Sequence, residues 1–199
     1  QIEPGALDCP DGSFDLIYSW SVLEHVDREL LPLVLRDLHR LLRPGGHLFI
    51  QIAPLYYASN GSHLGAVVPE PWGHLTNQLD AYRRKLRAAC PTEAAFAGLW
   101  STFETLNRLT APELVELVTA SGFTILREHA SSDGLEPPGT LLHAYDRAAL
   151  TTEQIVLLAA RDAPALPAPP PRQPRRPLAR RMRRLAKRLL RRLRAPGRR

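Results

Sequence analysis

The chain opens with a strand, a helix, a tight turn and a second strand in close succession, and this segment restricts the possible folds most strongly. Residues 14–20 form an apolar run rich in β-formers, which predicts a buried strand. Leucine and valine then recur every three or four residues over 31–42, which predicts an amphipathic helix with Asp27 as its cap and Pro32 in its first turn. The turn sequence Arg-Pro-Gly-Gly at 43–46 is expected to end this helix.

A second buried strand is predicted at 47–53. Strand, helix, turn and strand within about 40 residues make a βαβ unit, in which the two strands are parallel. Further along, a Thr-x-x-Glu capping box opens a predicted helix at 111–121, and two more strands are predicted at 123–127 and 155–160. The predicted fold class is therefore α/β, with helices covering a largely parallel sheet.

An insertion, residues 54–109, separates the second strand from the third and is far longer than an ordinary connection. Long loops of this kind often carry function. Placed over the strand ends, the insertion would act as a substrate lid, with aromatic rings that stack on a substrate and imidazoles that bind it. Alternatively, it packs on itself, with the tryptophan and the tyrosines as its own core. The candidate substrate-binding residues are Tyr56, Tyr57, His63, Trp72 and His74.

The net charge of +6 is carried by the end of the chain, because residues 172–199 contain 14 Arg and Lys and no acid. The remaining 171 residues hold 12 basic and 20 acidic side chains. Residues 163–177 contain seven prolines and read as an extended spacer. Residues 178–199 then place leucines on one helical face among arginines, which predicts a basic amphipathic helix or tail.

Three interpretations of this tail are open. It can bind an anionic membrane surface, bind nucleic-acid phosphates without sequence preference, or remain a solvated extension. The regular leucine stripe and the lack of aromatic residues favour the membrane. Two cysteines, Cys9 and Cys90, exclude a disulfide scaffold or a thiolate zinc site. With no apparent signal peptide or membrane span, the expected location is the cytoplasm, peripherally at the inner face of the membrane.

Three short motifs carry a resemblance to a known family. They are Asp-Gly-Ser-Phe-Asp-Leu-Ile-Tyr-Ser at 11–19, Val-Leu-Glu-His-Val at 22–26 and Leu-Arg-Pro-Gly-Gly at 42–46. In this order and spacing, residues 1–162 resemble the C-terminal portion of a class I S-adenosylmethionine-dependent methyltransferase, most similar to the small-molecule, lipid and sugar methyltransferases. The resemblance implies a Rossmann-like sheet of order 3-2-1-4-5-7-6 with strand 7 antiparallel.

By this resemblance, the four strands here are numbers 4, 5, 6 and 7. The first half, with the glycine-rich loop that binds the cofactor, is missing, so we expect a fragment or a processed chain. We also expect strand 4 to become an exposed apolar edge. The chain as given would then bind S-adenosylmethionine poorly and be inactive by itself.

The resemblance also implies site residues. Ser19, Trp20 and Ser21, at the end of the first strand, would lie beside the cofactor, and Glu3 falls near the position of the acidic turn that contacts adenine. Trp20 could instead be a core residue. His25 is the candidate catalytic base, since methyl transfer to a hydroxyl requires removal of a proton. Its structural alternative is to pack at the start of the next helix.

No metal site is expected from spacing alone. His25, His63, His74 and Glu70 do not stand in a helical register that would bring their ligand atoms together, and prolines flank Glu70. His63 or His74 could act as a second base.

The leading functional hypothesis is an S-adenosylmethionine-dependent methyltransferase that acts on an oxygen of a small molecule, a glycan or a lipid-linked precursor. The alternative is a truncated, non-catalytic binding module that its arginine-rich tail docks to a membrane or an acidic partner. A third hypothesis is methylation of RNA steered by the tail.

Overall fold

In a computed structural model of the chain, residues 7–162 are described. Three predictions lie outside these residues: the cofactor contact of Glu3, the proline-rich spacer 163–177 and the basic helix 178–199.

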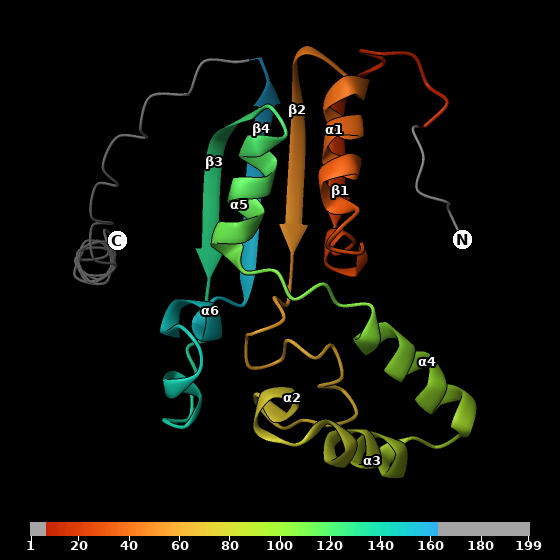
Figure 1. Cartoon of the computed structure of the whole chain (residues 1–199), viewed down its shortest axis with the longest axis vertical. Coiled ribbons are helices and arrows are strands. Elements are labelled where there is room, and N and C mark those ends of the chain that lie inside the picture. Colours follow the sequence, from red (N-terminus) through yellow and green to blue (C-terminus); the bar gives the residue numbers. More distant parts are fainter. Residues whose placement is uncertain (1–6, 163–199) are drawn as a thin grey trace, which may run out of the picture. The chain divides into compact units, whose positions relative to one another are not determined.

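The described residues form one mixed sheet of four strands (Figure 1). The order in the sheet is β1-β2-β4-β3, in which β1 and β2 are parallel and β4 is antiparallel to both of its neighbours. This arrangement is the 4-5-7-6 order that the methyltransferase resemblance implies, so the predicted Rossmann-like fold class is confirmed. The strands are β1 (Phe14–Trp20), β2 (Leu42–Ile52), β3 (Phe123–Ser131) and β4 (Gln154–Arg161).

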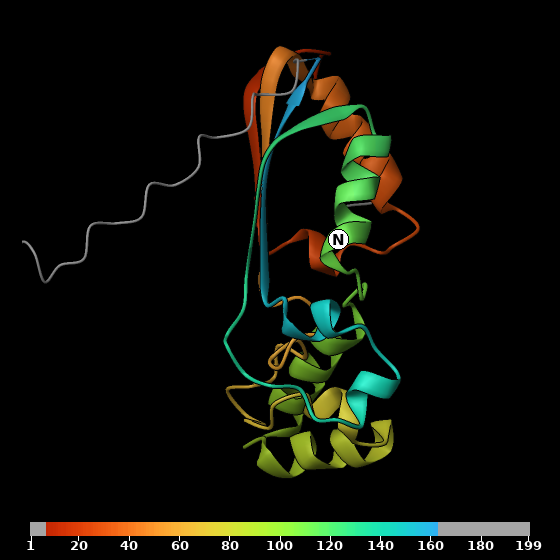
Figure 2. The ribbon, with the colours of Figure 1, turned by 90° about the vertical axis from the view of Figure 1, so that its left-hand side faces the viewer.

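Two helices, α1 (Leu31–Leu41) and α5 (Ala111–Ala120), cover the same face of the sheet (Figure 2). Their apolar stripes pack on the buried side chains of β2 and β4, and this layer forms the main core. Burial of these leucines and isoleucines supplies the largest favourable term for folding. Fully buried members include Leu35, Leu48, Ile50, Leu114 and Leu157.

The starts of the two helices differ from one another. The predicted capping box of α5 is confirmed: the Thr110 hydroxyl accepts from the Glu113 N–H, and Glu113 Oε2 accepts from the Thr110 N–H at 2.8 Å. The predicted cap of α1 is wrong, because Asp27 lies too far before the helix. Its carboxylate instead accepts from the Glu29 N–H at 3.0 Å, in a local turn. Pro32 does lie in the first turn, as predicted.

Strand β2 begins earlier than predicted, at Leu42, directly after α1. The Pro-Gly-Gly turn therefore lies within the strand as an irregularity, where the partner of Phe14 is Leu42 and the partner of Leu16 is already His47. A side chain at Gly46 would stand 2.8 Å from the Arg43 carbonyl oxygen, so only glycine fits there. The glycines thus permit a bulge rather than a separate loop.

The face of the sheet opposite α1 and α5 is apolar at β1. Leu16, Tyr18 and Trp20 are 56%, 72% and 62% exposed, and the Trp20 ring stacks on Phe49 with 6.2 Å between the ring centroids. Among the described residues, β1 pairs with β2 alone. The expected exposed apolar strand is therefore present, and the alternative that Trp20 is a core residue is wrong.

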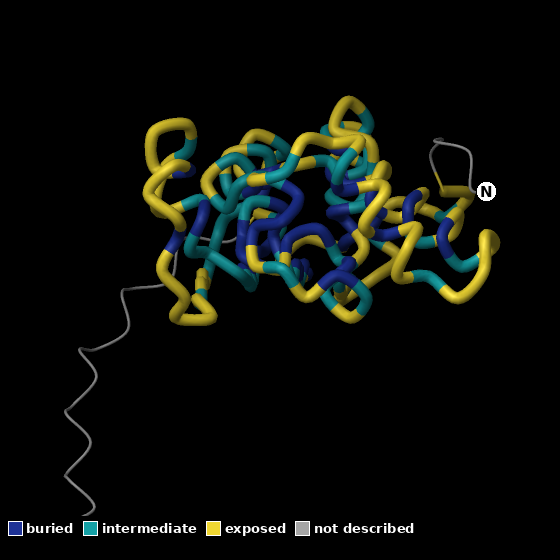
Figure 3. The backbone as a smooth tube through the Cα atoms, turned by 90° about the horizontal axis from the view of Figure 1, so that it is seen from below, coloured by how far each residue is buried: buried dark blue, intermediate teal, exposed yellow. Residues whose placement is uncertain are grey.

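The insertion lies beyond the carboxyl ends of β1 and β2 (Figure 1). It has a core of its own, built from Tyr82 and Leu86 of α3 and three aromatic residues of α4. Figure 3 shows buried segments in the middle of the molecule with exposed turns around them. The remaining helices are α2 (Gly73–Thr76), α3 (Leu79–Ala89), α4 (Glu93–Glu104), α6 (Arg147–Thr151), η1 (Leu23–His25) and η2 (Leu141–His143).

None of the helices within residues 7–162 combines the length and the apolar character that a membrane crossing requires.

Candidate functional site

The candidate site is built where β1 ends. Ser21, the first residue after the strand, has a φ of 48°, in the left-handed region that non-glycine residues rarely adopt. Its N–H donates to the Gln51 carbonyl at 2.9 Å, and its hydroxyl donates to Gln51 Oε1 at 2.9 Å. Strained residues of this kind concentrate at functional sites. The turn redirects the chain from β1 into η1.

Three of the four residues predicted to contact the cofactor, Ser19, Trp20 and Ser21, therefore lie at the carboxyl edge of the sheet. This edge is where open α/β sheets bind ligands. The Ser19 hydroxyl is buried without a hydrogen-bond partner, while the Trp20 ring is open to solvent. The Trp20 ring can thus serve a ligand as a flat apolar surface, whereas the Ser19 hydroxyl is buried on the opposite face of the strand.

Helix η1 places Glu24 against the core. Its side chain is only 4% exposed, and neither carboxylate oxygen has a hydrogen-bond partner among the described residues. Burial disfavours the ionised carboxylate and raises the pKa of Glu24 to about 7. A buried carboxylate without a partner is unusual and calls for a physical explanation.

His25 is half-buried and held by one hydrogen bond. Its Nδ1 lies 3.0 Å from Thr105 Oγ1, and that hydroxyl donates its only hydrogen to the Thr102 carbonyl at 2.8 Å. The hydroxyl must therefore accept from His25, which places the hydrogen on Nδ1 and leaves a lone pair on Nε2. Burial lowers the pKa of His25 and favours this neutral form.

His63 comes from the insertion and is held by a backbone carbonyl. Its Nε2 lies 2.9 Å from the Pro54 carbonyl oxygen, which can only accept, so Nε2 carries the hydrogen and Nδ1 has the lone pair. Burial is also the main cause that lowers the pKa of His63. The residue has a φ of 60°, so its backbone too is in the left-handed region.

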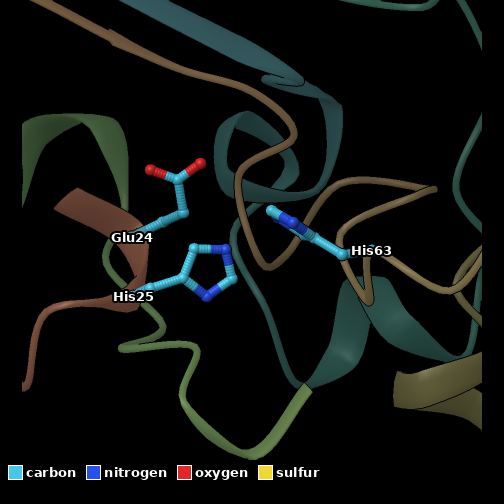
Figure 4. A group of neighbouring side chains, drawn as sticks. All are labelled: Glu24, His25 and His63. Carbon is cyan, nitrogen blue, oxygen red and sulfur yellow. The ribbon is translucent and has the colours of Figure 1, made fainter. Parts of the chain in front are cut away.

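Glu24, His25 and His63 converge, although His63 stands 38 positions after His25 in the sequence (Figure 4). One ligand atom of each lies within 4.8 Å of one ligand atom of each of the others. The imidazole rings are 5.2 Å apart between centroids and meet edge to face. The sequence analysis named both histidines but assigned no role to Glu24. The signal that it missed was an acid inside the otherwise apolar stretch Val-Leu-Glu-His-Val.

The other predicted substrate residues divide into two groups. Tyr56, Trp72 and His74 are each no more than 9% exposed, and their burial fits the alternative that the insertion packs on itself. The Trp72 Nε1–H donates to the carbonyls of Tyr57 and Leu150, and His74 Nε2 bonds the Tyr56 carbonyl at 2.6 Å. Tyr57 is half-buried and lines a cavity together with residues of β3, α5 and α6. Of the predicted residues, Tyr57 and His63 are therefore the ones placed to meet a ligand.

His74 is expected to make the protein less stable in acid. Burial, aided by Arg108 and His63, lowers the pKa of His74 from 6.5 to about 4. The folded state therefore favours the neutral ring, and its contribution is complete above pH 6.5 and is lost as the pH falls towards 4. Linkage gives a loss of about 2 kcal/mol of unfolding free energy between pH 7.5 and pH 5.

Urea unfolding at these two pH values measures the effect. In His74→Gln, which keeps a donor towards the Tyr56 carbonyl, the difference in unfolding free energy between pH 7.5 and pH 5 should be smaller by about 2 kcal/mol. In His129→Gln, an exposed control on β3, this difference should be the same as in the parent. An unchanged pH dependence in His74→Gln would show that this ring does not titrate on unfolding.

The model of a methyltransferase domain family matches residues 2–128. The chain belongs to this family. All three motifs that suggested a class I methyltransferase lie within the matched residues, so that resemblance is confirmed at the level of the family. No curated protein sequence matches this methyltransferase-family chain.

Similar solved structures include two S-adenosylmethionine-dependent methyltransferases. The protein from Methanosarcina mazei is 19% identical, with a TM-score of 0.44 over 80% of this chain and 65% of that one. The protein from Mesorhizobium loti is 20% identical, with a TM-score of 0.43 over 80% of this chain and 67% of that one. The chain thus spans about two thirds of the length of either structure.

Proposed function

We propose that this methyltransferase-family chain is part of an enzyme that transfers a methyl group from S-adenosylmethionine to an oxygen of a small molecule, a glycan or a lipid-linked precursor. The observation that carries the proposal is the free Nε2 lone pair of His25, five residues beyond the end of β1. His25 follows Ser19, Trp20 and Ser21 closely in the chain, and the family membership and the sheet topology favour the cofactor at this edge of the sheet.

In the proposed reaction, the acceptor oxygen attacks the methyl carbon in line with the sulfur. The carbon–oxygen bond forms as the carbon–sulfur bond breaks, and S-adenosylhomocysteine leaves. The hydroxyl proton passes to Nε2 of His25 and then to solvent. Thr105 keeps the imidazole in the required tautomer through Nδ1. Most of the rate enhancement would come from alignment of the two substrates.

The insertion would hold the acceptor. His63 faces His25 across the site, and Tyr57 lines the neighbouring cavity together with Thr110 at the start of α5. Tyr56, Trp72 and His74 would act indirectly, because they fix the fold of the loop that bears His63. Both a tyrosine hydroxyl and an imidazole can bond the oxygen of a hydroxyl-bearing acceptor, which suits the proposed substrate class.

The test supplies the complete gene product with methyl-labelled S-adenosylmethionine and separate pools of phenols, glycans and lipid-linked precursors. The proposal predicts label in an O-methyl group in one pool, identified by mass spectrometry. Label found only in N-methyl or C-methyl products would contradict oxygen as the acceptor. No labelled product from any pool would contradict the proposed substrate classes.

We further propose that the basic segment 172–199 holds the protein at an anionic membrane surface in the cytoplasm. Its charge and leucine stripe support this location. Deletion of 172–199 should abolish co-sedimentation with vesicles that contain phosphatidylserine. Binding of the intact chain should fall steeply as salt rises. Equal binding to neutral vesicles, or binding that survives the deletion, would contradict the proposal.

A further inference from the structure

The starting point is the carboxylate of Glu24, which is buried and has no partner. Water cannot reach it freely, because the residue is 4% exposed, and no described side chain donates a hydrogen bond to either oxygen. An ionised carboxylate is not stable in such surroundings unless a positive group faces it. A partner of this carboxylate therefore has to come from outside the described side chains, as a proton, a buried water or a cation.

Each of the two imidazoles near Glu24 has one unprotonated nitrogen whose lone pair can coordinate a metal ion. Thr105 fixes the hydrogen of His25 on Nδ1, and the Pro54 carbonyl fixes that of His63 on Nε2. The opposite nitrogens, Nε2 of His25 and Nδ1 of His63, are thereby left as acceptors. A metal-binding histidine in proteins shows this arrangement, since its second nitrogen donates to a neighbouring oxygen that orients the ring.

We propose that Glu24, His25 and His63 form a binding site for a divalent transition-metal ion, with Zn²⁺ as the ion that fits best. Two imidazole nitrogens and one carboxylate oxygen are a donor set that zinc binds in enzymes. Mg²⁺ and Ca²⁺ prefer oxygen ligands throughout, so the two nitrogens disfavour them. Three protein ligands leave a fourth position open for water or a substrate oxygen.

The geometry is close to that of a bound site. The three ligand atoms lie within 4.8 Å of one another, whereas ligands of tetrahedral zinc at bond lengths of about 2.0–2.1 Å are roughly 3.4 Å apart. The three side chains come from two segments, η1 and the insertion loop around His63, so a small approach of the loop would close the site (Figure 4). The sequence analysis expected no metal because it considered only helical spacing, whereas tertiary packing brings these residues together.

The existence of this site does not rest on the proposed methyl transfer, but its role does. With the ion bound, Nε2 of His25 is a ligand and is no longer free to accept a proton. The open position would then hold the acceptor oxygen, and the ion would lower the pKa of that hydroxyl. The two roles of His25 exclude each other, so dependence of the reaction on the ion distinguishes them.

The experiment titrates the full chain, stripped with a chelator, with Zn²⁺ in a calorimeter, and with Co²⁺ in a visible absorption spectrometer. We expect one high-affinity ion per chain and a Co²⁺ spectrum typical of a four-coordinate nitrogen and oxygen site. Glu24→Gln and His63→Gln should each weaken Zn²⁺ binding by at least about 100-fold. His129→Gln is the matched control, because it removes an exposed imidazole of β3 and should leave the affinity unchanged.

Thr105→Val provides a test that remains valid if Glu24→Gln or His63→Gln fails to fold. Thr105 is exposed, so the substitution should be tolerated, yet it removes the hydroxyl that orients His25 and should weaken Zn²⁺ binding about 10-fold to 100-fold. Absence of tight binding, or tight binding that these three variants do not change, would overturn the site and leave a proton or a water as the partner of Glu24. Methyl transfer that persists after chelation would refute the catalytic role of the ion but not the proposed methyltransferase.

Discussion

Replacement of His25 by alanine is expected to lower the rate of methyl transfer by about 10²-fold to 10⁴-fold, the usual contribution of a positioned acid or base. The imidazole lies five residues beyond the end of β1, and its free Nε2 is the atom that would act. A role as a metal ligand predicts a loss as well. The measurement is the initial rate with labelled S-adenosylmethionine and the acceptor identified from the pools.

Cofactor binding separates a chemical defect from a folding defect. The affinity of His25→Ala for S-adenosylhomocysteine should match that of the parent, because the cofactor residues precede η1. His47→Ala provides a matched control, since it removes an exposed imidazole of β2. Its rate should be unchanged. An unchanged rate in His25→Ala would remove this residue from the mechanism.

The second large effect concerns Gly61, which is buried in the loop that carries His63. A side chain there would run into the backbone oxygens of Leu55 and Tyr56, which belong to the same loop. Because backbone atoms cannot give way cheaply, Gly61→Ala is expected to destabilise the protein by about 2–4 kcal/mol. It should also displace His63 and weaken the proposed metal site.

A second glycine of the insertion gives the matched comparison. Gly98 lies in α4, is exposed, and has nothing within 4 Å of an added side chain. Gly98→Ala should therefore stabilise the protein by about 0.5–1 kcal/mol, since alanine favours the helix. Urea unfolding of both variants measures the contrast. Equal effects of the two substitutions would show that the packing around Gly61 is not as tight as described.

The sheet was predictable because its signals are local. Each strand is indicated by a short apolar run in the sequence. The order β1-β2-β4-β3 was implied by the resemblance to a known family, which three motifs within 11–46 carry. The capping box at Thr110 and Glu113 was equally readable, since both partners lie within four residues. The start of α1 could not be predicted in this way. Aspartate is common both at helix caps and in tight turns, and Asp27 forms a local turn rather than a cap.

The site was only half predictable, because its members come together through tertiary packing. His25 could be predicted as an imidazole in a family motif. Nothing in the sequence shows, however, that the insertion folds back so that His63 lies close to His25. Likewise, Trp72 and His74 have the composition of a binding surface, and only their burial identifies them as core residues of the insertion. The orphaned carboxylate of Glu24 is a property of its surroundings, not of its position in the sequence.

The most direct test of the account is a calorimetric titration of the complete gene product with S-adenosylmethionine, using Trp20→Ala and Tyr18→Ala. Both rings are exposed on the same face of β1, but only Trp20 lies at its carboxyl end. We predict micromolar binding that Trp20→Ala weakens roughly tenfold, as expected for loss of one aromatic contact, and that Tyr18→Ala leaves unchanged. No binding, or equal losses in both variants, would contradict a cofactor site at this edge of the sheet.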